Sequence, residues 1–352
     1  MTKINEQNTT SRRKFLKVAG VAGAATMVAT GLQSNSQAAQ HGDDPIAITE
    51  PKPGPYLYKH KSDFSVITVG TGCPEPVIGR SGPCAMVQYK GNYFLVDVGA
   101  GTTKRLCEMG ISPGAIKNVL FTHHHADHNE GYTKWLINSW MVGRTSLDLV
   151  GPPTTKAFHE LLVTFYAKDL KYRATLQGLP LEAMYNAKIQ EFEGANTFNI
   201  DGVKISTAEL THTMYNLGYR FEVDGKVIVV SGDTSFDEDL ITLAKDADVL
   251  IMDSGMVPNT AMIGASMPMA EDAAKKSGPP PAPPKNTDKT SVRPHPGPGE
   301  VAKMAMGANV KKLVLTHFPP FMIDEAKTIQ EIKDAGFKGE VIIGEDLMEI
   351  TA

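Results

Sequence analysis

The sequence predicts an α/β protein in which helices cover β-sheets, and three observations lead to this fold class. The 352 residues are 41% hydrophobic and 21% charged, a composition typical of a globular chain with enough apolar material for a core. Strand-like and helix-like segments recur through both halves of the chain, so they do not separate into all-α and all-β domains. The three cysteines cannot form a closed set of pairs, which leaves disulfide bonds a minor role at most.

The periodic apolar segments begin near Ser62 and predict the elements in order. The β-type runs are Phe64–Val69, Tyr93–Val98, Asn118–Thr122, Lys204–Glu209, Gly218–Val223, Lys226–Val230, Val249–Met252, Lys312–Thr316 and Glu340–Ile343. Helical patterns cover Thr103–Gly110, Lys156–Leu170 and about Asp324–Ala335. The turn-rich stretch Gly70–Pro83 separates the first two strands.

The first 38 residues have the three parts of an export signal. A basic start is followed by the apolar run Val18–Leu32 and by the small-residue site Ser36-Gln37-Ala38. The run is shorter than the roughly 20 apolar residues of a membrane-spanning helix. The pair Arg12-Arg13 ahead of Phe-Leu-Lys resembles the twin-arginine signal, read by machinery that exports folded proteins. An uncleaved amphipathic tail is the alternative, but we expect cleavage near Ala39, a periplasmic protein and no stable membrane association afterwards.

The chain is expected to divide into residues 1–38 as the signal, 39–61 as a linker or arm, and 62–352 as one domain. A proline-rich lid is expected as an insertion around residues 256–299, because Gly278–Gly299 holds 8 of the 23 prolines and no apolar periodicity. The formal net charge of −4 includes five cationic residues and one Glu in the first 38 positions, so the remainder carries −8. A domain with this net negative charge is a poor binder of phosphates, so nucleic acid is not expected as the main partner.

A histidine cluster follows the apolar strand that ends at Thr122, and we expect the chemistry at such strand ends. Neutral imidazoles and carboxylates are good zinc ligands. In an extended loop the side chains of His123 and His125 point the same way and can share one ion, while Asp127 and His128 can face a second. His124 is expected to point away. A polar surface loop is the alternative, but imidazoles are costly to crowd together without a cation.

Three more candidate ligands, His212, Asp233 and His317, also follow predicted strands. Taken singly, a histidine in such a position is more often a packed or capping residue. Together with the cluster they supply seven nitrogen and oxygen ligands and no thiolate. Two Zn²⁺ ions with a bridging water need a set of about this size.

The spacing His-x-His-x-Asp-His, with Asp97 before it and His212, Asp233 and His317 after it, resembles the metallo-β-lactamase superfamily over residues 66 to about 347. Within that superfamily the sequence most resembles the ribonuclease Z and arylsulfatase-like branch. The stretches that carry this resemblance are Val69–Gly72 with Pro76 and Arg80, Asp97–Thr102, Gly218–Phe221, Gly232–Thr234 and Leu315–Phe318. The resemblance implies an αββα sandwich, with two mixed β-sheets packed face to face, helices outside and the metals at one edge.

The resemblance also implies a role for each candidate residue. The ligands it assigns to the first zinc are His123, His125 and His212, and those it assigns to the second are Asp127, His128 and His317. Asp233 would bridge the two ions. Asp97 would orient the histidine loop through hydrogen bonds.

Departures from the family patterns separate the possible activities. Family members that degrade β-lactams with two zincs have Cys at the position of Asp233, and the iron flavoproteins have Glu at that of His125, so both activities are disfavoured. Ribonuclease Z has a Glu at the position of Asp253 and a His that pairs with it, which His295 matches. We expect His295 to donate a proton or to stabilise the leaving group, the alternative being an ordinary histidine in the lid. The sequence has no basic, glycine-rich arm of the kind with which ribonuclease Z clamps transfer RNA.

We therefore expect an exported binuclear zinc hydrolase that cleaves a small anionic ester, as an arylsulfatase-like enzyme or a phosphodiesterase. In that mechanism a metal-bridging hydroxide attacks, Asp127 accepts a proton and His295 assists the leaving oxygen. A ribonuclease Z that processes the 3′ side of transfer RNA is the alternative. A non-catalytic scaffold would have lost ligands, whereas lactone or thioester hydrolases share them.

The substrate, the ion loaded in the cell and the oligomeric state, a homodimer being one option, stay open. Several apolar residues could line the mouth of the site, although such residues are more often core. These are Trp135, Trp140, Phe318, Met256, Met262, Met267 and Met269.

Overall fold

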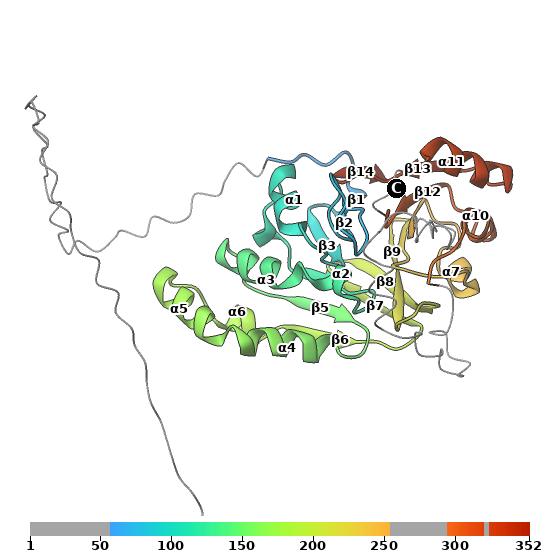
Figure 1. The fold of residues 1–352 in the computed structure, drawn as a ribbon. Helices are drawn as coiled ribbons and strands as arrows, with labels where there is room; N and C mark the ends of the chain where they lie inside the picture. The colour runs from blue at the N-terminus through green and yellow to red at the C-terminus, as the bar shows by residue number, and fades with distance from the viewer. Residues whose placement is uncertain (1–56, 254–293, 320–323) are drawn as a thin grey trace, which may run out of the picture. The chain divides into compact units, whose positions relative to one another are not determined.

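The computed structural model describes residues 57–253, 294–319 and 324–352, and these form a sandwich of two seven-stranded β-sheets (Figure 1). The predicted signal, the linker up to residue 56 and residues 256–293 of the predicted lid lie outside the described residues. The αββα arrangement implied by the family resemblance is confirmed. None of the helices in the described ranges has the length and apolarity needed to cross a membrane.

Each sheet is antiparallel in one half and parallel in the other. The first sheet contains, in spatial order, β14 (Met348–Thr351), β1 (Phe64–Gly70), β2 (Cys84–Tyr89), β3 (Asn92–Val96), β4 (Asn118–Leu120), β5 (Asp148–Gly151) and β6 (Lys188–Glu191). The second contains β13 (Glu340–Ile343), β12 (Lys312–Thr316), β11 (Val249–Asp253), β10 (Lys226–Val230), β9 (Asn216–Val223), β8 (Val203–Leu210) and β7 (Asn196–Ile200). Strands β3 to β6 and strands β10 to β13 are the parallel segments.

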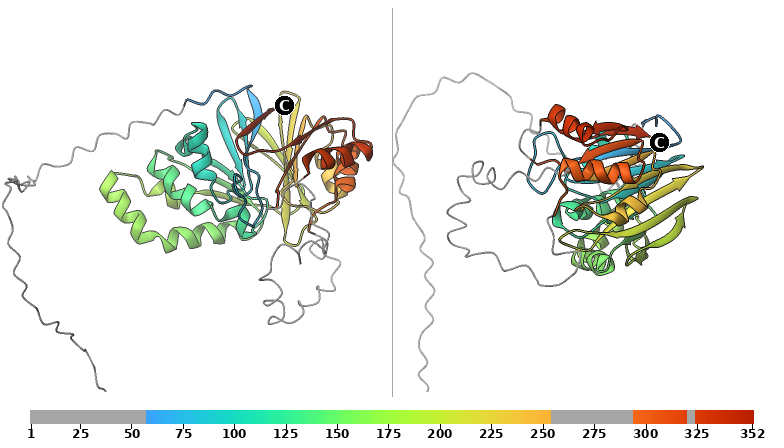
Figure 2. Two further views of the ribbon diagram at one scale, coloured as in Figure 1. Left: turned by 45° about the horizontal axis from the view of Figure 1, so that its top comes forward. Right: turned by 90° about the vertical axis from the view of Figure 1, so that its right-hand side faces the viewer.

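Helices lie on the outer face of each sheet, as the two views in Figure 2 show. Those on the side of the first sheet are α1 (Thr102–Met109), α3 (Tyr132–Met141), α4 (Thr155–Phe165), α5 (Ala167–Gln177) and α6 (Glu182–Tyr185). Those on the side of the second are α7 (Glu238–Leu243), α10 (Pro298–Gly307) and α11 (Glu325–Asp334). The short α2 (Ala126–Asn129) and the 3₁₀ turn Pro113–Ala115 lie in connections of the first half.

Three apolar layers hold the sandwich together. One lies between the sheets, where Phe94 of the first packs on Phe221 of the second with ring centroids 5.8 Å apart. The other two lie between each sheet and its own helices. Because the sheets are covered on both faces, a strand such as β1 is buried along its whole length, including its polar residues Ser65 and Thr68.

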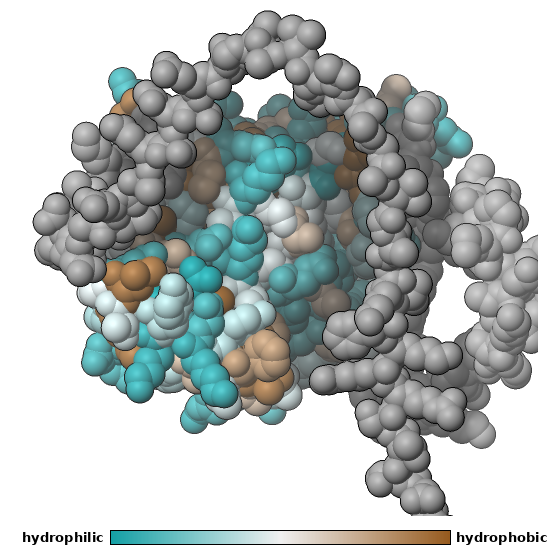
Figure 3. Space-filling model, turned by 60° about the vertical axis from the view of Figure 1, so that its left-hand side comes forward, coloured by the Kyte–Doolittle hydropathy of each residue, from teal (hydrophilic) through white to brown (hydrophobic). Residues whose placement is uncertain are grey.

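The aromatic residues proposed for either the mouth or the core are core residues. Trp135 and Trp140 are buried under the first sheet, and Phe318 is buried under the second. The four methionines considered with them lie outside the described residues. On the side that carries α4 and α5, hydrophilic residues are interspersed with small hydrophobic areas (Figure 3).

One sequence prediction needs correction, and a second meets a helix at its boundary. The single helix expected over Lys156–Leu170 is two helices, since α4 ends at Phe165 and α5 begins at Ala167. The insertion expected around residues 256–299 overlaps at its last residues with a helix, because α10 begins at Pro298. Proline is favoured at a first helical position, where its missing N–H is not needed, so the end of the proline-rich stretch is a helix start.

Candidate metal centre

The seven predicted ligands lie together at the edge where β4, β8, β10 and β12 end. Candidate ligand atoms that all lie within 4.8 Å of one another form three groups; one joins Asp233, Asp253, His295 and His317, and the other two contain the seven predicted ligands. Of these two, the first group is His123, His125, His212 and Asp233, and the second is Asp127, His128 and His317. Loops that follow strands of both sheets thus bring together residues from distant parts of the chain.

In the first group, three imidazole nitrogens converge on one point. Nδ1 of His125 lies 3.0 Å from Nε2 of His123 and 3.1 Å from Nε2 of His212. One proton on His125 could satisfy only one of these contacts. Zinc–nitrogen bonds of 2.0–2.1 Å in a tetrahedral site place ligand nitrogens about 3.3 Å apart, so the observed spacing fits a shared ion.

The tautomers of two of these imidazoles are fixed by their outer nitrogens. The Nδ1 of His212 is 3.0 Å from the carbonyl oxygen of Pro294, which can only accept, so this nitrogen carries the proton. The Nδ1 of His123 is 2.9 Å from the hydroxyl of Thr122, whose own proton is donated to Asp97. Both Nε2 atoms therefore turn their lone pairs toward the centre, as metal ligation requires.

The electrostatics keep the three imidazoles of this group neutral. Burial lowers the pKa of His123 well below its ordinary value, and burial also lowers the pKa of His125. For His212, burial and the neighbouring His125 and His295 lower the pKa to about 4, although Asp233 opposes the change. Neutral imidazole is the form that binds metal ions, so these three side chains are ready to bind at pH 7.

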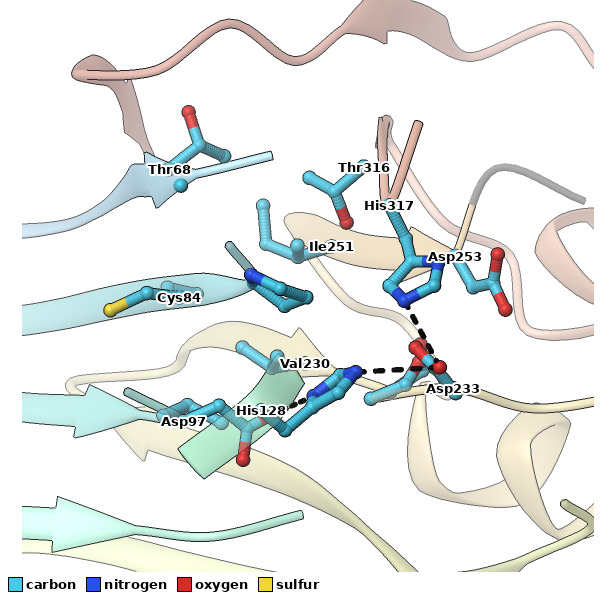
Figure 4. A pocket seen from close by; sticks show the side chains of 16 residues that line it. Thr68, Cys84, Asp97, His128, Val230, Asp233, Ile251, Asp253, Thr316 and His317 are labelled. Carbon is cyan, nitrogen blue, oxygen red and sulfur yellow. Dashed lines mark hydrogen bonds and ion pairs between the residues drawn. The ribbon is translucent and has the colours of Figure 1, made fainter. Parts of the chain in front are cut away.

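The second group meets the first at Asp233. Oδ2 of Asp233 lies 3.2 Å from Nε2 of His317 and 3.4 Å from Nε2 of His128, which point toward it in Figure 4. The same oxygen lies 3.8 Å from Nε2 of His212 and 4.0 Å from Nε2 of His123. Asp233 thus occupies the position between the groups that a bridging ligand needs.

A buried nitrogen in the second group supports a metal site. Nε2 of His128 is buried and makes no hydrogen bond among the described residues, although it lies 3.5 Å from Oδ2 of Asp127. An unpaired buried polar atom is costly unless something binds it. Because Nδ1 of His128 donates to Asp97 at 2.8 Å, Nε2 is the atom that faces the centre, where it can bind a metal ion once it has lost its proton.

The buried carboxylates Asp127 and Asp233 are stabilised by positive charge beside them. Burial opposes the charged form of His317, but Asp233 and the hydrogen bond with Asp127 outweigh it and raise the pKa of His317 to about 9. Burial is likewise outweighed at Asp233, whose pKa is lowered well below its ordinary value by His317 and His128. A divalent cation supplies this charge as imidazolium protons do, so the donor set fits a metal ion.

Asp97 connects the two groups, as the sequence predicts. Its Oδ1 accepts from the backbone N–H of Thr122 at 2.8 Å, and its Oδ2 accepts from the Thr122 hydroxyl at 2.7 Å and from His128. One carboxylate therefore orients His128 directly and His123 through Thr122. The sequence analysis missed Thr122, although its place immediately before the histidine cluster was a usable signal.

A glycine makes room for Asp233. Gly232 has a φ of +63°, and a Cβ there would lie 2.6 Å from Oδ1 of Asn216 and 2.7 Å from Cβ of Thr122. Only glycine tolerates both the left-handed backbone and this close approach. The Gly232-Asp233 pair thus places the carboxylate beside the histidine loop.

His124 lies outside the centre, in agreement with its predicted orientation. Its Nε2 is 2.8 Å from the hydroxyl of Thr155, and its ring packs against Phe121 and Phe158. The histidine therefore anchors the loop to α4.

His295 stands at the edge of the ligand groups and pairs with Asp253. Its Nδ1 forms a short hydrogen bond with Oδ2 of Asp253, and its ring centroid lies 5.2 Å from that of His317. Burial would lower the pKa of His295, but the hydrogen bond and charge of Asp253 outweigh burial and raise it. The pairing expected from the sequence is present.

A cavity of about 260 Å³ lies over the ligands. Its described lining residues are Pro74, His125, Ala126, Asp127, His212, Thr213, Asp233, Pro294, His295 and His317. Neither Lys nor Arg occurs among them. The open side of the centre is thus lined by imidazoles, carboxylates and small residues.

Comparison with known proteins places this arrangement among metallo-hydrolases. A family model described as "Anti-Pycsar protein Apyc1" matches residues 64–266, more than half of the chain. Ribonuclease Z of Mycobacterium marinum is 27% identical over 294 residues, which cover 82% of this chain and 98% of that protein.

Solved structures with the same fold include the metallo-β-lactamase fold protein YhfI of Bacillus subtilis (TM-score 0.61, 18% identity, 82% of this chain and 100% of that one). Zn²⁺-bound PqqB of Methylobacterium extorquens is also similar (TM-score 0.59, 15% identity, 82% and 100%). The expected fold and the ribonuclease Z-like relatives are confirmed by these matches.

Proposed function

The chain belongs to the Anti-Pycsar Apyc1 family and is a metal-dependent hydrolase of phosphoric ester bonds, and from this premise we propose that it cleaves a small phosphodiester with two Zn²⁺ ions. One observation carries the proposal: two groups of ligands converge on Asp233 beside the His295–Asp253 pair. Three imidazoles with Asp233 suit one ion, and Asp127, His128 and His317 with Asp233 suit the other.

When bound, two such ions polarise the ester oxygens and lower the pKa of water, which is the chemistry of binuclear hydrolases. The protein groups supply proton transfer. Asp127, ionised because His317 lowers its pKa against the effect of burial, accepts a proton from the attacking water. His295, kept protonated by Asp253, donates a proton to the leaving oxygen.

The lining of the cavity favours a small substrate over a long polyanion. Nucleic-acid binding gains affinity when Lys and Arg neutralise phosphates, and the described lining contains neither residue. The −8 charge of the chain after residue 38 works in the same direction. A single phosphodiester, by contrast, needs only the two cations. A sulfate monoester presents a similar tetrahedral centre and is a second small ester that the site would accept.

The test is a substrate panel with purified protein loaded with Zn²⁺. We expect turnover of bis-p-nitrophenyl phosphate and of a nucleoside cyclic monophosphate, the smallest phosphodiester that a nucleotide forms. Turnover of p-nitrophenyl sulfate alone would replace the phosphodiesterase with an arylsulfatase-like enzyme. A lactone and a thioester complete the panel, and protein that binds two ions but cleaves none of these substrates would refute the proposal.

Ribonuclease Z activity is the second candidate, and the curated relatives favour it. The relative from Mycobacterium marinum is named for that activity and aligns along nearly its whole length. Precursor transfer RNA with a 3′ trailer therefore belongs in the panel. Cleavage at the 3′ side of the transfer RNA at a higher kcat/KM than any small diester would make this the function.

We further propose that the protein acts after export through the twin-arginine machinery, in a periplasm. The basis is the sequence of the first 38 residues, with Arg12-Arg13 ahead of an apolar run. Replacing both arginines with lysine should leave the precursor in the cytoplasm, detected by cell fractionation and by the uncleaved mass. Equal export of the Lys-Lys variant would contradict it.

A further inference from the structure

The connection between β13 and β14 carries a carboxylate that no function described above uses. Oδ1 of Asp346 accepts from the backbone N–H of Thr71 at 2.9 Å and from its hydroxyl at 2.8 Å. Oδ2 accepts from the N–H of Ser81 at 2.7 Å and from Nε of Arg105 at 3.0 Å. Three donors from the two ends of the β1–β2 loop and a fourth from α1 thus meet on one side chain.

Arg80, in the same loop, extends this arrangement toward the metal centre. Its Nη1 donates to the hydroxyl of Thr71 and to the carbonyl of Gly344, each at 2.6 Å. The guanidinium lies over the ring of Phe318, 4.4 Å from its centroid. The loop and the β13–β14 connection therefore enclose the residue that follows His317.

The backbone completes the path to the ligand. Phe318 donates its N–H to the carbonyl of Thr71 at 2.9 Å and forms a β-bridge with Gly72. His317 itself has a φ of +62°, a left-handed conformation that few residues other than glycine adopt, although histidine is among those that adopt it more readily. Phe318, on its C-terminal side, is held by the contacts described above.

This path matters because the second ligand group draws on both sheets. Asp127 and His128 follow β4 of the first sheet, whereas His317 follows β12 of the second. The β1–β2 loop belongs to the first sheet, and β13 and β14 belong to different sheets. The β13–β14 connection joins the two sheets. A carboxylate in it can therefore fix the position of His317 relative to Asp127 and His128.

We propose that Asp346 is a positioning residue for the metal ion held by Asp127, His128 and His317. It acts through Thr71 and Arg80 on Phe318, and thereby holds His317 in the conformation that directs Nε2 at the carboxylates. The inference rests on the proposed two-ion centre. Loss of this distant carboxylate is therefore expected to weaken the binding of that ion and to leave the affinity for the other ion unchanged.

The chain offers a matched control in Glu349. This buried carboxylate lies in β14, close to Asp346 in sequence, and also accepts several hydrogen bonds, from Tyr58, Lys61 and Ser65. These partners lie before β1 or at its start, whereas Thr71 follows the last residue of that strand. Glu349→Gln therefore measures what losing a buried carboxylate of this edge does to the fold alone.

The experiment titrates Co²⁺ into metal-free full-length protein and follows the visible d–d bands, with Zn²⁺ competition against a chromophoric chelator. In Asp346→Asn, an amide –NH₂ would face the donors Ser81 and Arg105. We expect one of the two ions to bind about 10- to 100-fold more weakly, as when an outer partner of a ligand is removed. That ion should be the one whose bands disappear in His317→Ala. Both ions should bind Glu349→Gln as they bind the wild type.

Two results would overturn the inference: wild-type affinity for both ions in folded Asp346→Asn, or equal weakening in Glu349→Gln. If Asp346→Asn does not fold, Arg80→Met is measured by the same criteria, because it keeps apolar contact with Phe318 and loses both hydrogen bonds. Turnover is assayed separately. Wild-type protein that binds both ions without cleaving any ester would refute the proposed function and leave the positioning role standing.

Discussion

The two ligand groups of the centre are built from different chemistry. The first gathers three imidazoles whose pKa values burial lowers, and hydrogen bonds to Thr122 and Pro294 fix two of their tautomers. The second places two imidazoles among carboxylates, which raise the pKa of His317 to about 9. The imidazoles of the first group are thus neutral and preorganised, whereas those of the second group are charged.

In the proposed two-ion centre, the contrast predicts that the two groups bind their ions in different ways. The neutral group needs no proton loss before it binds a cation, so its affinity is set by geometry. The charged group must exchange imidazolium protons for a metal ion, so its affinity depends on pH and on the alignment of the two sheets. Perturbations that act on charge or on alignment should therefore separate the two ions.

The largest effect is expected from Asp233→Ala, because this carboxylate is the one residue that both groups share. Both ions should bind more weakly, and turnover should fall on the order of 10⁴-fold, as when a member of a catalytic unit is removed. Metal analysis by mass spectrometry and the diester assay measure the two effects. Glu160→Ala on the exposed face of α4 is the control, and a variant that keeps both ions would remove Asp233 from the bridging position.

His295→Ala should come next, with kcat lowered by about 10²- to 10⁴-fold and metal content unchanged. Because the role proposed for His295 is that of an acid, the loss should be greater for an alkyl diester than for p-nitrophenyl esters, whose leaving group needs no proton. In the wild type, kcat for the alkyl diester should fall as pH rises above the raised pKa of His295. Equal losses with both leaving groups would exclude proton donation.

A pH series should separate the groups without any mutation. His317 and His128, whose pKa values are raised, must lose protons to bind a metal ion, so the affinity of the second ion should increase between pH 7 and 9. The expected slope is about tenfold per pH unit for each proton released. The first ion should show a flat profile over this range, because its imidazoles are already neutral. Chelator competition at fixed ionic strength gives both slopes, and parallel profiles would contradict the comparison.

The raised pKa of His317 also predicts how the stability of the metal-free protein changes with pH. The folded-state pKa of His317 is about 9, above the ordinary value of 6.5, so its charge stabilises the fold fully below pH 6.5. This contribution is lost as pH rises through 9. Chelator-treated wild type should therefore lose more thermal stability between pH 6.5 and 9 than chelator-treated His317→Gln. An equal loss in both proteins would show that His317 carries no such charge.

Most of the candidate centre was visible in the sequence because its ligands follow apolar strands directly. The middle of β12 is the apolar run Leu313–Leu315, so the polar residues that follow it, Thr316 and His317, stand out. The interval in His-x-His-x-Asp-His likewise reflects one local turn, from an extended loop into α2. Local sequence therefore contains both the strand end and the side-chain direction.

The supporting residues could not be predicted in the same way. Asp346 lies 275 positions after Thr71, and nothing in the local sequence of either residue indicates the other. Strands such as β6 and β7 were missed because their burial alternates weakly at the sheet edges, which leaves little apolar signal. Long-range contacts of polar groups are set by packing of the whole domain.

The smallest effect is expected from removal of the Thr122 hydroxyl, which tests the hydrogen-bonded connection between the two ligand groups. Thr122→Val keeps the shape of the side chain but removes the hydroxyl that accepts from His123 and donates to Asp97. The tautomer of His123 is then no longer fixed, and the first ion should bind about tenfold more weakly. The second ion should be nearly unaffected, because Asp97 still accepts directly from His128. In Asp97→Asn both connections are weakened, so both ions should lose affinity. If Thr122→Val weakened the two ions equally, the hydroxyl would serve the whole loop and the two groups would not be oriented separately.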